Sequence, residues 1–113
     1  MLQRYGTECA FCSISEKKLL DTAHLIGKEH KGSDDPRNGL PVCPTHHRAM
    51  GEKTGMLRIH PATLEVVADN GATLDGLRIT KTSLNHLPKP PHQDALKYLW
   101  DKQEASIKTK SSG

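Results

Sequence analysis

Two short segments, Cys9-Ala10-Phe11-Cys12 and Cys43-Pro44-Thr45-His46, decide the fold of this 113-residue chain. Each segment pairs two residues that bind metals, with two residues between them, and 30 residues separate the pairs. Paired ligands of this kind can place three thiolates and one imidazole tetrahedrally around zinc. The alternative is a set of buried free thiols beside an unrelated histidine, which leaves both spacings unexplained. We therefore expect Cys9, Cys12, Cys43 and His46 to hold a structural Zn²⁺ that pins together the ends of the intervening segment.

The composition explains why such a metal site would be needed. The length fits one domain, and only 35% of the residues are hydrophobic and 4% aromatic, so the core is small. The odd number of cysteines argues against a disulfide framework. No apolar run approaches the roughly 20 residues that a membrane span requires. These features favour a small metal-stabilised domain over the membrane and disulfide-rich classes.

Charge and the first residues indicate the compartment and the kind of partner. A net charge of +3 and a pI near 8.8 suit a polyanionic partner, although the basic residues are scattered. Residues 1–5 lack the apolar segment of a secretory signal. We expect a cytoplasmic protein, where thiols stay reduced and bind metals.

The pattern along the chain predicts an α+β fold. Residues 19–26 and 40–43 are expected to be strands separated by a polar loop, and residues 44–50 a helix with Pro44 in its first turn. Residues 56–60 and 63–67 alternate like a half-buried hairpin, and residues 77–80 resemble a third strand. Residues 94–100 have helical spacing and begin a C-terminal helix, whose apolar residues end at Ile107. We predict one domain over residues 1–108, with a metal-braced core at 1–55, an extension at 56–108 and a flexible tail at 109–113.

One histidine beside the predicted zinc site has no role in it. His47 follows His46 directly, and adjacent residues of a helix point about 100° apart, so both cannot comfortably bind one ion. His47 is therefore available for another function. His30, His60, His86 and His92 lie outside any motif and are expected to be exposed or structural.

Three further segments carry a family resemblance: residues 20–26 (LDTAHLI), residues 34–40 (DDPRNGL) and residues 42–50 (VCPTHHRAM). Together they resemble an HNH nuclease over residues 8–51, with His24, Asn38 and His47 in the positions of the three letters. The resemblance implies a ββα-metal motif, two strands and a helix braced by a zinc site. A weaker likeness extends to about residue 103 and is similar to HNH domains fused to readers of modified DNA in restriction enzymes.

The resemblance implies metal-dependent hydrolysis of DNA phosphodiester bonds. His24 would be the general base, since histidine titrates near neutral pH. A catalytic Mg²⁺ or Mn²⁺ would lie near His47, with Asn38 either touching the ion or hydrogen-bonding the loop so that the base is aimed correctly. Many relatives carry Asp or His before the base, whereas this chain has Ala23. Asp21 is the candidate replacement ligand, although residues 21 and 24 face opposite sides of an ideal strand.

The prediction extends to the residues that contact nucleic acid and to the partners of the protein. Arg48, Arg37 and Lys28 are the candidate nucleic-acid contacts. One site cuts one strand, so a double-strand break would need a homodimer or two nicks, and specificity would come from a linked or separate DNA-reading domain. The chain would be prokaryotic or phage-encoded, as a restriction-enzyme module or a stand-alone nuclease. The main alternative is a non-catalytic zinc-ribbon module that binds nucleic acid, and a purely structural zinc-stapled module ranks behind it.

Overall fold

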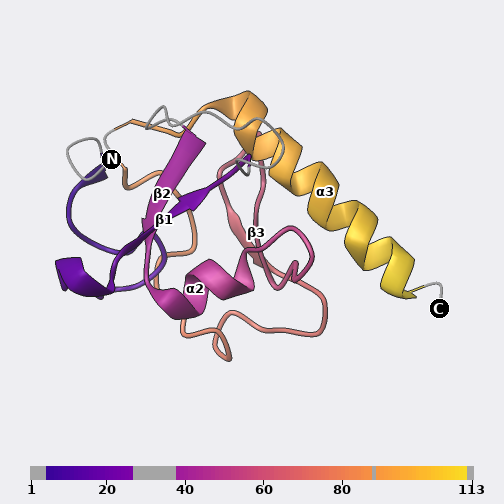
Figure 1. Cartoon of the computed structure of the whole chain (residues 1–113), viewed down its shortest axis with the longest axis horizontal. Helices are drawn as coiled ribbons and strands as arrows, with labels where there is room; N and C mark the ends of the chain where they lie inside the picture. Colours follow the sequence, from indigo (N-terminus) through magenta and orange to yellow (C-terminus); the bar gives the residue numbers. More distant parts are fainter. Residues whose placement is uncertain (1–4, 27–37, 88, 112–113) are drawn as a thin grey trace.

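The structure, a computed structural model, describes residues 5–26, 38–87 and 89–111. Figure 1 shows a pair of strands beside a short helix in the first half of the chain, and a long helix at its C-terminal end. The elements are η1 (Lys17–Leu19), β1 (Asp21–His24), β2 (Gly39–Val42), α2 (Pro44–Ala49), β3 (Leu57–Ile59), β4 (Val66–Ala68) and α3 (Gln93–Ser111). The architecture is α+β, as the sequence predicts.

The first hairpin and α2 form a ββα unit. Strands β1 and β2 pair antiparallel, with Asp21 opposite Val42 and His24 opposite Gly39. Pro41, in the middle of β2, has no N–H to donate, but its carbonyl accepts a 2.8 Å hydrogen bond from Ala10 N–H. Helix α2 then begins with Pro44 as its first residue, where the absent N–H costs nothing. This unit confirms the predicted strand, strand and helix, with the first strand shorter than the pattern indicates.

The second hairpin is confirmed, but the third predicted strand is wrong. Strands β3 and β4 pair antiparallel, with Leu57 opposite Ala68, whereas residues 74–78 form turns. The alternation of Leu77 and Ile79 resembles a strand because both side chains are buried. The backbone around them bonds elsewhere: the N–H groups of Thr80 and Lys81 both donate to the carbonyl of Phe11. This segment therefore ties the C-terminal extension to the first cysteine pair.

Helix α3 covers the second hairpin. Ala95, Leu96 and Leu99 are buried on its inner face, and the helix packs on β3. It continues to Ser111, so the sequence pattern places its end too early. No helix in the described part of the chain combines the length and hydropathy needed to cross a bilayer.

Candidate metal centre and catalytic pocket

Four metal-ligand side chains meet in the interior, as their spacing predicts. One donor atom from each of Cys9, Cys12, Cys43 and His46 lies within 4.8 Å of all the others, and all four residues are buried. Residues from the first cysteine pair and from the start of α2 are thus brought together although 37 positions separate Cys9 from His46. The three thiols form no disulfide. A buried Cys3His cluster of this kind is a zinc-binding arrangement.

The orientation of His46 fits a metal ligand. Its Nδ1 lies 3.4 Å from Cys9 Sγ and 3.3 Å from Cys43 Sγ. Tetrahedral zinc, with bonds of about 2.3 Å to sulfur and 2.0 Å to nitrogen, separates such atoms by about 3.5 Å. The other ring nitrogen, Nε2, lies 2.7 Å from the Leu77 carbonyl oxygen, to which it donates its proton. A ligating histidine is commonly held in this way, with a backbone carbonyl fixing its tautomer and leaving the opposite lone pair for the metal.

The thiols differ in their readiness to ionise. Burial raises the pKa of the Cys9 thiol, but the hydrogen bond between its sulfur and the His46 ring and those from the N–H groups of Phe11 and Cys43 outweigh it and lower the pKa to about 6. Burial and the neighbouring sulfur of Cys9 raise the pKa of Cys12 to about 12. Burial, reinforced by the neighbouring sulfur atoms, thus favours the protonated form of Cys12. A divalent ion would allow all three to become thiolates, since a coordinating thiol is deprotonated outright.

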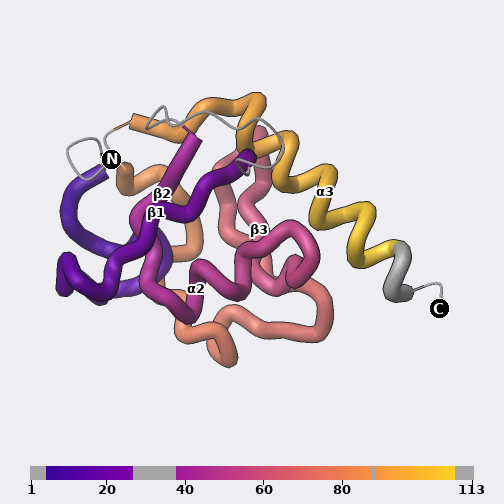
Figure 2. Tube along the Cα trace, in the orientation of Figure 1, coloured from indigo at the N-terminus to yellow at the C-terminus, as the bar shows by residue number. Residues whose placement is uncertain are grey.

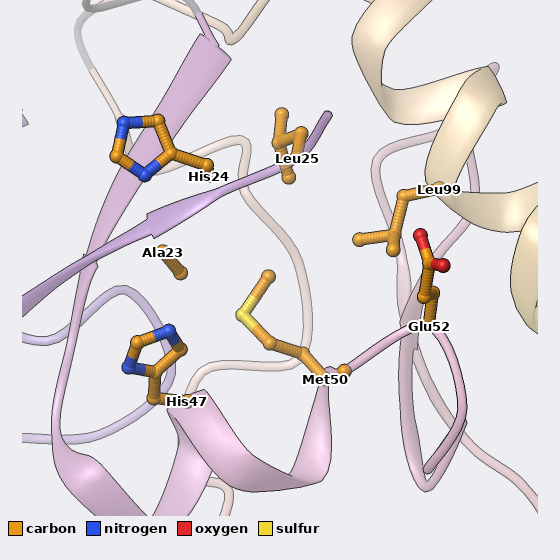
Figure 3. Close-up of a pocket in the computed structure, with 8 residues that line it drawn as sticks. Ala23, His24, Leu25, His47, Met50, Glu52 and Leu99 are labelled. Atoms are coloured by element: carbon orange, nitrogen blue, oxygen red, sulfur yellow. The ribbon is translucent and has the colours of Figure 1, made fainter. Parts of the chain in front are cut away.

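A second candidate site, made of residues outside the Cys3His cluster, is a pocket of about 190 Å³ lined by His24 and His47. Figure 3 shows His24 extending from β1 and His47 from α2, with Ala23 between them. The buried side chains of Leu25, Met50 and Leu99 complete its apolar wall. The pocket therefore combines two polar imidazoles with an apolar wall.

Asp21 contacts His47 in this second site. Its Oδ2 accepts a hydrogen bond from His47 Nδ1 at 3.1 Å, and both side chains are about half exposed. Asp21 is the first residue of β1 and is not among the residues that line the pocket, so it contacts the site through His47. The carboxylate fixes which nitrogen of His47 carries the proton, leaving Nε2 as the nitrogen that can bind an ion.

Asn38 is 5% exposed and bonds across the hairpin just beyond the pairing of His24 with Gly39. Its Oδ1 accepts from Ile26 N–H at 2.9 Å, and its Nδ2 donates to the Ile26 carbonyl at 3.1 Å. The Asn38 carbonyl also accepts from Leu25 N–H at 2.8 Å. These three bonds fix the backbone that follows His24.

Of the three predicted nucleic-acid contacts, only Arg48 is among the residues that the structure describes. Arg48 is exposed on α2, beside His47, whereas Arg37 and Lys28 lie outside the described residues. Glu52 and Leu99 also line the pocket and were not anticipated. Glu52 follows the end of α2 and Leu99 comes from α3, so no periodicity within one element connects either of them to His24 or His47.

The segment that carries both sites also matches a known protein family. Residues 9–53 match the family model described as HNH endonuclease. The matched segment begins at Cys9, the first cysteine of the Cys3His cluster, and ends just after α2, so it contains the ββα unit, that cluster and both pocket histidines. The resemblance to HNH nucleases is thus confirmed for this segment, which implies a function related to nucleic acids. No curated protein matches the chain.

Proposed function

We propose that this protein is a metal-dependent HNH endonuclease that hydrolyses DNA phosphodiester bonds. The observation that carries the proposal is the shared pocket of His24 and His47, in a segment that matches the HNH endonuclease family and apart from the Cys3His cluster. Two imidazoles in one pocket provide a proton acceptor and a nitrogen ligand, which are the two groups that this hydrolysis needs.

In this proposal His24 is the general base. Its imidazole takes a proton from a water molecule, which then attacks phosphorus in line with the leaving 3′ oxygen. The bond between phosphorus and that oxygen breaks, leaving a 5′ phosphate and a 3′ hydroxyl. His24 is suited to this role because it is partly exposed at the pocket while its neighbours Ala23 and Leu25 are buried and fix the strand.

His47 is proposed to hold the catalytic ion through Nε2, with Asp21 orienting the ring through Nδ1. Mg²⁺ or Mn²⁺ bound there would neutralise charge on the phosphate and on the leaving oxygen. One oxygen of the Asp21 carboxylate lies 3.1 Å from His47 Nδ1, so Asp21 would act on the ion indirectly, through the His47 ring. The other route is a water molecule that bridges the second Asp21 oxygen and the ion. Asn38 serves as a positioning residue, since both ends of its amide bond Ile26 and hold the backbone beside the base.

The Cys3His cluster is proposed to hold a structural Zn²⁺. Four protein ligands close the coordination shell, so this ion stabilises the fold and does not activate water. We propose that residues 1–108 act as one nuclease domain, in which residues 56–108 support the core at 1–55. Leu99 supports this arrangement because α3 thereby contributes to the pocket wall.

Arg48, Arg37 and Lys28 are the proposed phosphate contacts, and DNA is the proposed substrate. Because one pocket cuts one strand, we propose that double-strand cleavage uses a homodimer or successive nicks. A linked or separate DNA-reading domain would supply specificity, as in a restriction enzyme of a prokaryote or phage, acting in the cytoplasm.

Ala23 favours one alternative, a zinc-ribbon module that binds nucleic acid without cutting it. This residue lines the pocket beside His24 but offers no ligand atom. The alternative assigns the Cys3His cluster the same structural role and assigns no chemistry to His24 and His47.

Nicking of supercoiled plasmid DNA in Mg²⁺ or Mn²⁺ separates the two functions. We expect the zinc-loaded wild type to nick the plasmid and His24→Ala to be slower by at least about 100-fold, the usual contribution of a general base. His86→Ala is the matched control, because His86 is exposed and outside the pocket. DNA binding without cleavage in the wild type would support the binding module instead.

A further inference from the structure

The turn η1 (Lys17–Leu19) combines exposed apolar and basic side chains. All three of its residues are exposed, and Leu19 is 49% exposed. In the described ranges, Ile14 at 37% is the only other large hydrophobic side chain that is exposed. Neither Lys17 nor Lys18 forms an ion pair with any residue that the structure describes. The turn therefore presents two ammonium groups and one apolar side chain to solvent.

The backbone of this turn is fixed, although its side chains are exposed. The Glu16 carboxylate accepts a hydrogen bond from Lys18 N–H at 3.4 Å, and the Glu16 carbonyl accepts one from Leu19 N–H at 2.9 Å. The Ile14 carbonyl accepts from Cys9 N–H at 2.8 Å, which ties the segment to the Cys3His cluster. Glu16 is the one acid of residues 14–19, and its carboxylate bonds the backbone of the turn.

The turn lies close to the histidine that is proposed to hold the catalytic ion. Asp21, the first residue of β1, bonds His47 Nδ1 at 3.1 Å. Figure 2 shows the turn as a bend of the indigo tube that leads directly into β1. Leu19 precedes Asp21 by two positions and Lys18 by three, so their Cα atoms lie within about 7 Å and about 11 Å of the Asp21 Cα.

These spans match the dimensions of DNA. Successive phosphates of one strand advance about 3.4 Å along the helix axis. A phosphate at the ion would therefore have neighbours, a few nucleotides along the strand, within reach of the lysine side chains of η1. Arg48, exposed beside His47 on α2, adds a third positive charge near the same pocket.

We propose that η1 contacts the DNA beside the cut: Lys17 and Lys18 bind backbone phosphates, and Leu19 packs against the sugar and base edge between them. The inference rests on the proposed function for its ligand. Lysine binds phosphate as a point charge, and apolar side chains placed in a groove commonly accompany such contacts. Charge also decides between two partners. An anionic strand attracts both lysines, whereas a symmetric second copy of the chain would bring the same positive charges against them.

The test uses a fluorescent 20-base-pair DNA duplex and the zinc-loaded full chain, without Mg²⁺ so that cleavage does not interfere. We expect Lys17→Ala and Lys18→Ala each to bind roughly eightfold more weakly at 0.1 M salt. Each should also lower the salt slope by about one, as for one lost phosphate contact. Lys97→Ala is the matched control, because it removes the same charge from the exposed face of α3, where Lys97 pairs with Asp101. It should bind nearly as the wild type does.

Leu19→Ser tests the apolar contact separately. We expect it to bind roughly fivefold more weakly with an unchanged salt slope, because it removes apolar contact area and no charge. Ile14→Ser is the matched control, since Ile14 is the other exposed large hydrophobic side chain among the described residues, and it should bind as the wild type does. Because the side chains of η1 are exposed, its variants should keep the melting temperature of the wild type.

Wild-type affinity and salt slope in both lysine variants would overturn the proposal. So would an equal loss in Lys97→Ala, which would show a general charge effect. Unchanged DNA affinity in Leu19→Ser would also overturn it, and an accompanying shift from dimer to monomer in sedimentation would assign the turn to self-association instead. Plasmid nicking by the wild type tests the proposed nuclease separately: a protein that binds DNA through η1 but does not cut retains this inference and loses the nuclease.

Discussion

Residues 9–53 and residues 54–111 are held together by different means. The first region has two four-residue strands and a six-residue helix, and its interior includes the four donor atoms of the Cys3His cluster. The second has strands of only three residues, but a 19-residue helix covers them with an apolar face. The first region matches a nuclease family, while the second supplies packing. The comparison teaches that the proposed catalytic residues lie in the region whose backbone is held by a cluster of metal-ligand side chains rather than by a large core.

The two regions are nevertheless joined at the metal centre. The Phe11 carbonyl, between the first two cysteines, accepts from Thr80 and Lys81, and His46 bonds the Leu77 carbonyl. Loss of the metal should therefore loosen the second region as well as the first.

The largest effect is expected from Cys43→Ser, which removes a ligand from the centre of the first region. We expect loss of zinc and a fall of several kcal/mol in the free energy of unfolding, because metal binding contributes directly to folding. Zinc content and urea unfolding measure both. Thr45→Ser, an exposed change in the same segment, should alter neither. Unfolding at an unchanged urea concentration would contradict a structural metal.

The next effect is expected from Arg58→Met in the second region. Arg58 is only 3% exposed, forms 2.9 Å ion pairs with Asp69 and Glu104, and stacks 3.8 Å from the centre of the Trp100 ring. Both carboxylates are about 40% exposed, so water can replace the lost guanidinium. We therefore expect the free energy of unfolding to fall by about 2 kcal/mol. Urea unfolding measures it, and Lys97→Ala, in an exposed ion pair, should cost under about 0.5 kcal/mol.

Zinc content distinguishes the destabilisation caused by Arg58→Met from the destabilisation caused by Cys43→Ser. Arg58→Met should keep its zinc, since none of Arg58, Asp69 and Glu104 belongs to the Cys3His cluster. If it loses the metal as Cys43→Ser does, the two regions are not separate in the way the comparison states.

Asp21→Asn should have a smaller effect, on catalysis alone. Replacing the carboxylate weakens the bond that sets the tautomer of His47, and we expect nicking to slow roughly tenfold with a higher Mg²⁺ requirement. Asp21→Glu should recover part of the rate, and zinc content should stay unchanged. An unchanged metal requirement would show that Asp21 does not orient His47.

The smallest effect concerns acid stability of the second region. The N–H of Asn70 and then the Arg58 guanidinium lower the pKa of Asp69 below its ordinary value of 3.8. Since the pKa is lower in the folded state, this contribution is present above about pH 4 and is lost as the pH falls through the folded pKa. Asp69→Asn should flatten that part of the stability profile in urea unfolding between pH 3 and 6. An exposed control, Asp75→Asn, should leave the profile as it is.

The sequence predicts the first region better than the second. The spacing of the two ligand pairs predicts the Cys3His cluster, and local apolar and proline signals predict both strands and the start of α2 at Pro44. The segment 77–80 misleads because burial of Leu77 and Ile79 produces the alternation of a strand without a strand partner. The backbone donors there bond Phe11, a contact across the chain that no local pattern encodes.

The pocket was predicted only in part. His24 and His47 follow from the family resemblance, but the contribution of Leu99 depends on where α3 packs. The contact between Asp21 and His47 depends on the pairing of β1 with β2 and on the position of α2, which bring together residues 26 positions apart. Such contacts arise from tertiary structure and leave no periodic signal.

The central claim is that two adjacent histidines on α2 have different functions, His46 in the fold and His47 in the chemistry. Measuring bound zinc and plasmid nicking on the same samples of the wild type and His47→Ala tests it most directly. The account predicts one zinc per chain in both proteins and nicking lowered by at least about 100-fold in the variant, as expected on removal of the ligand for the catalytic ion. Loss of zinc in His47→Ala, or undiminished nicking by a zinc-loaded variant, would contradict it.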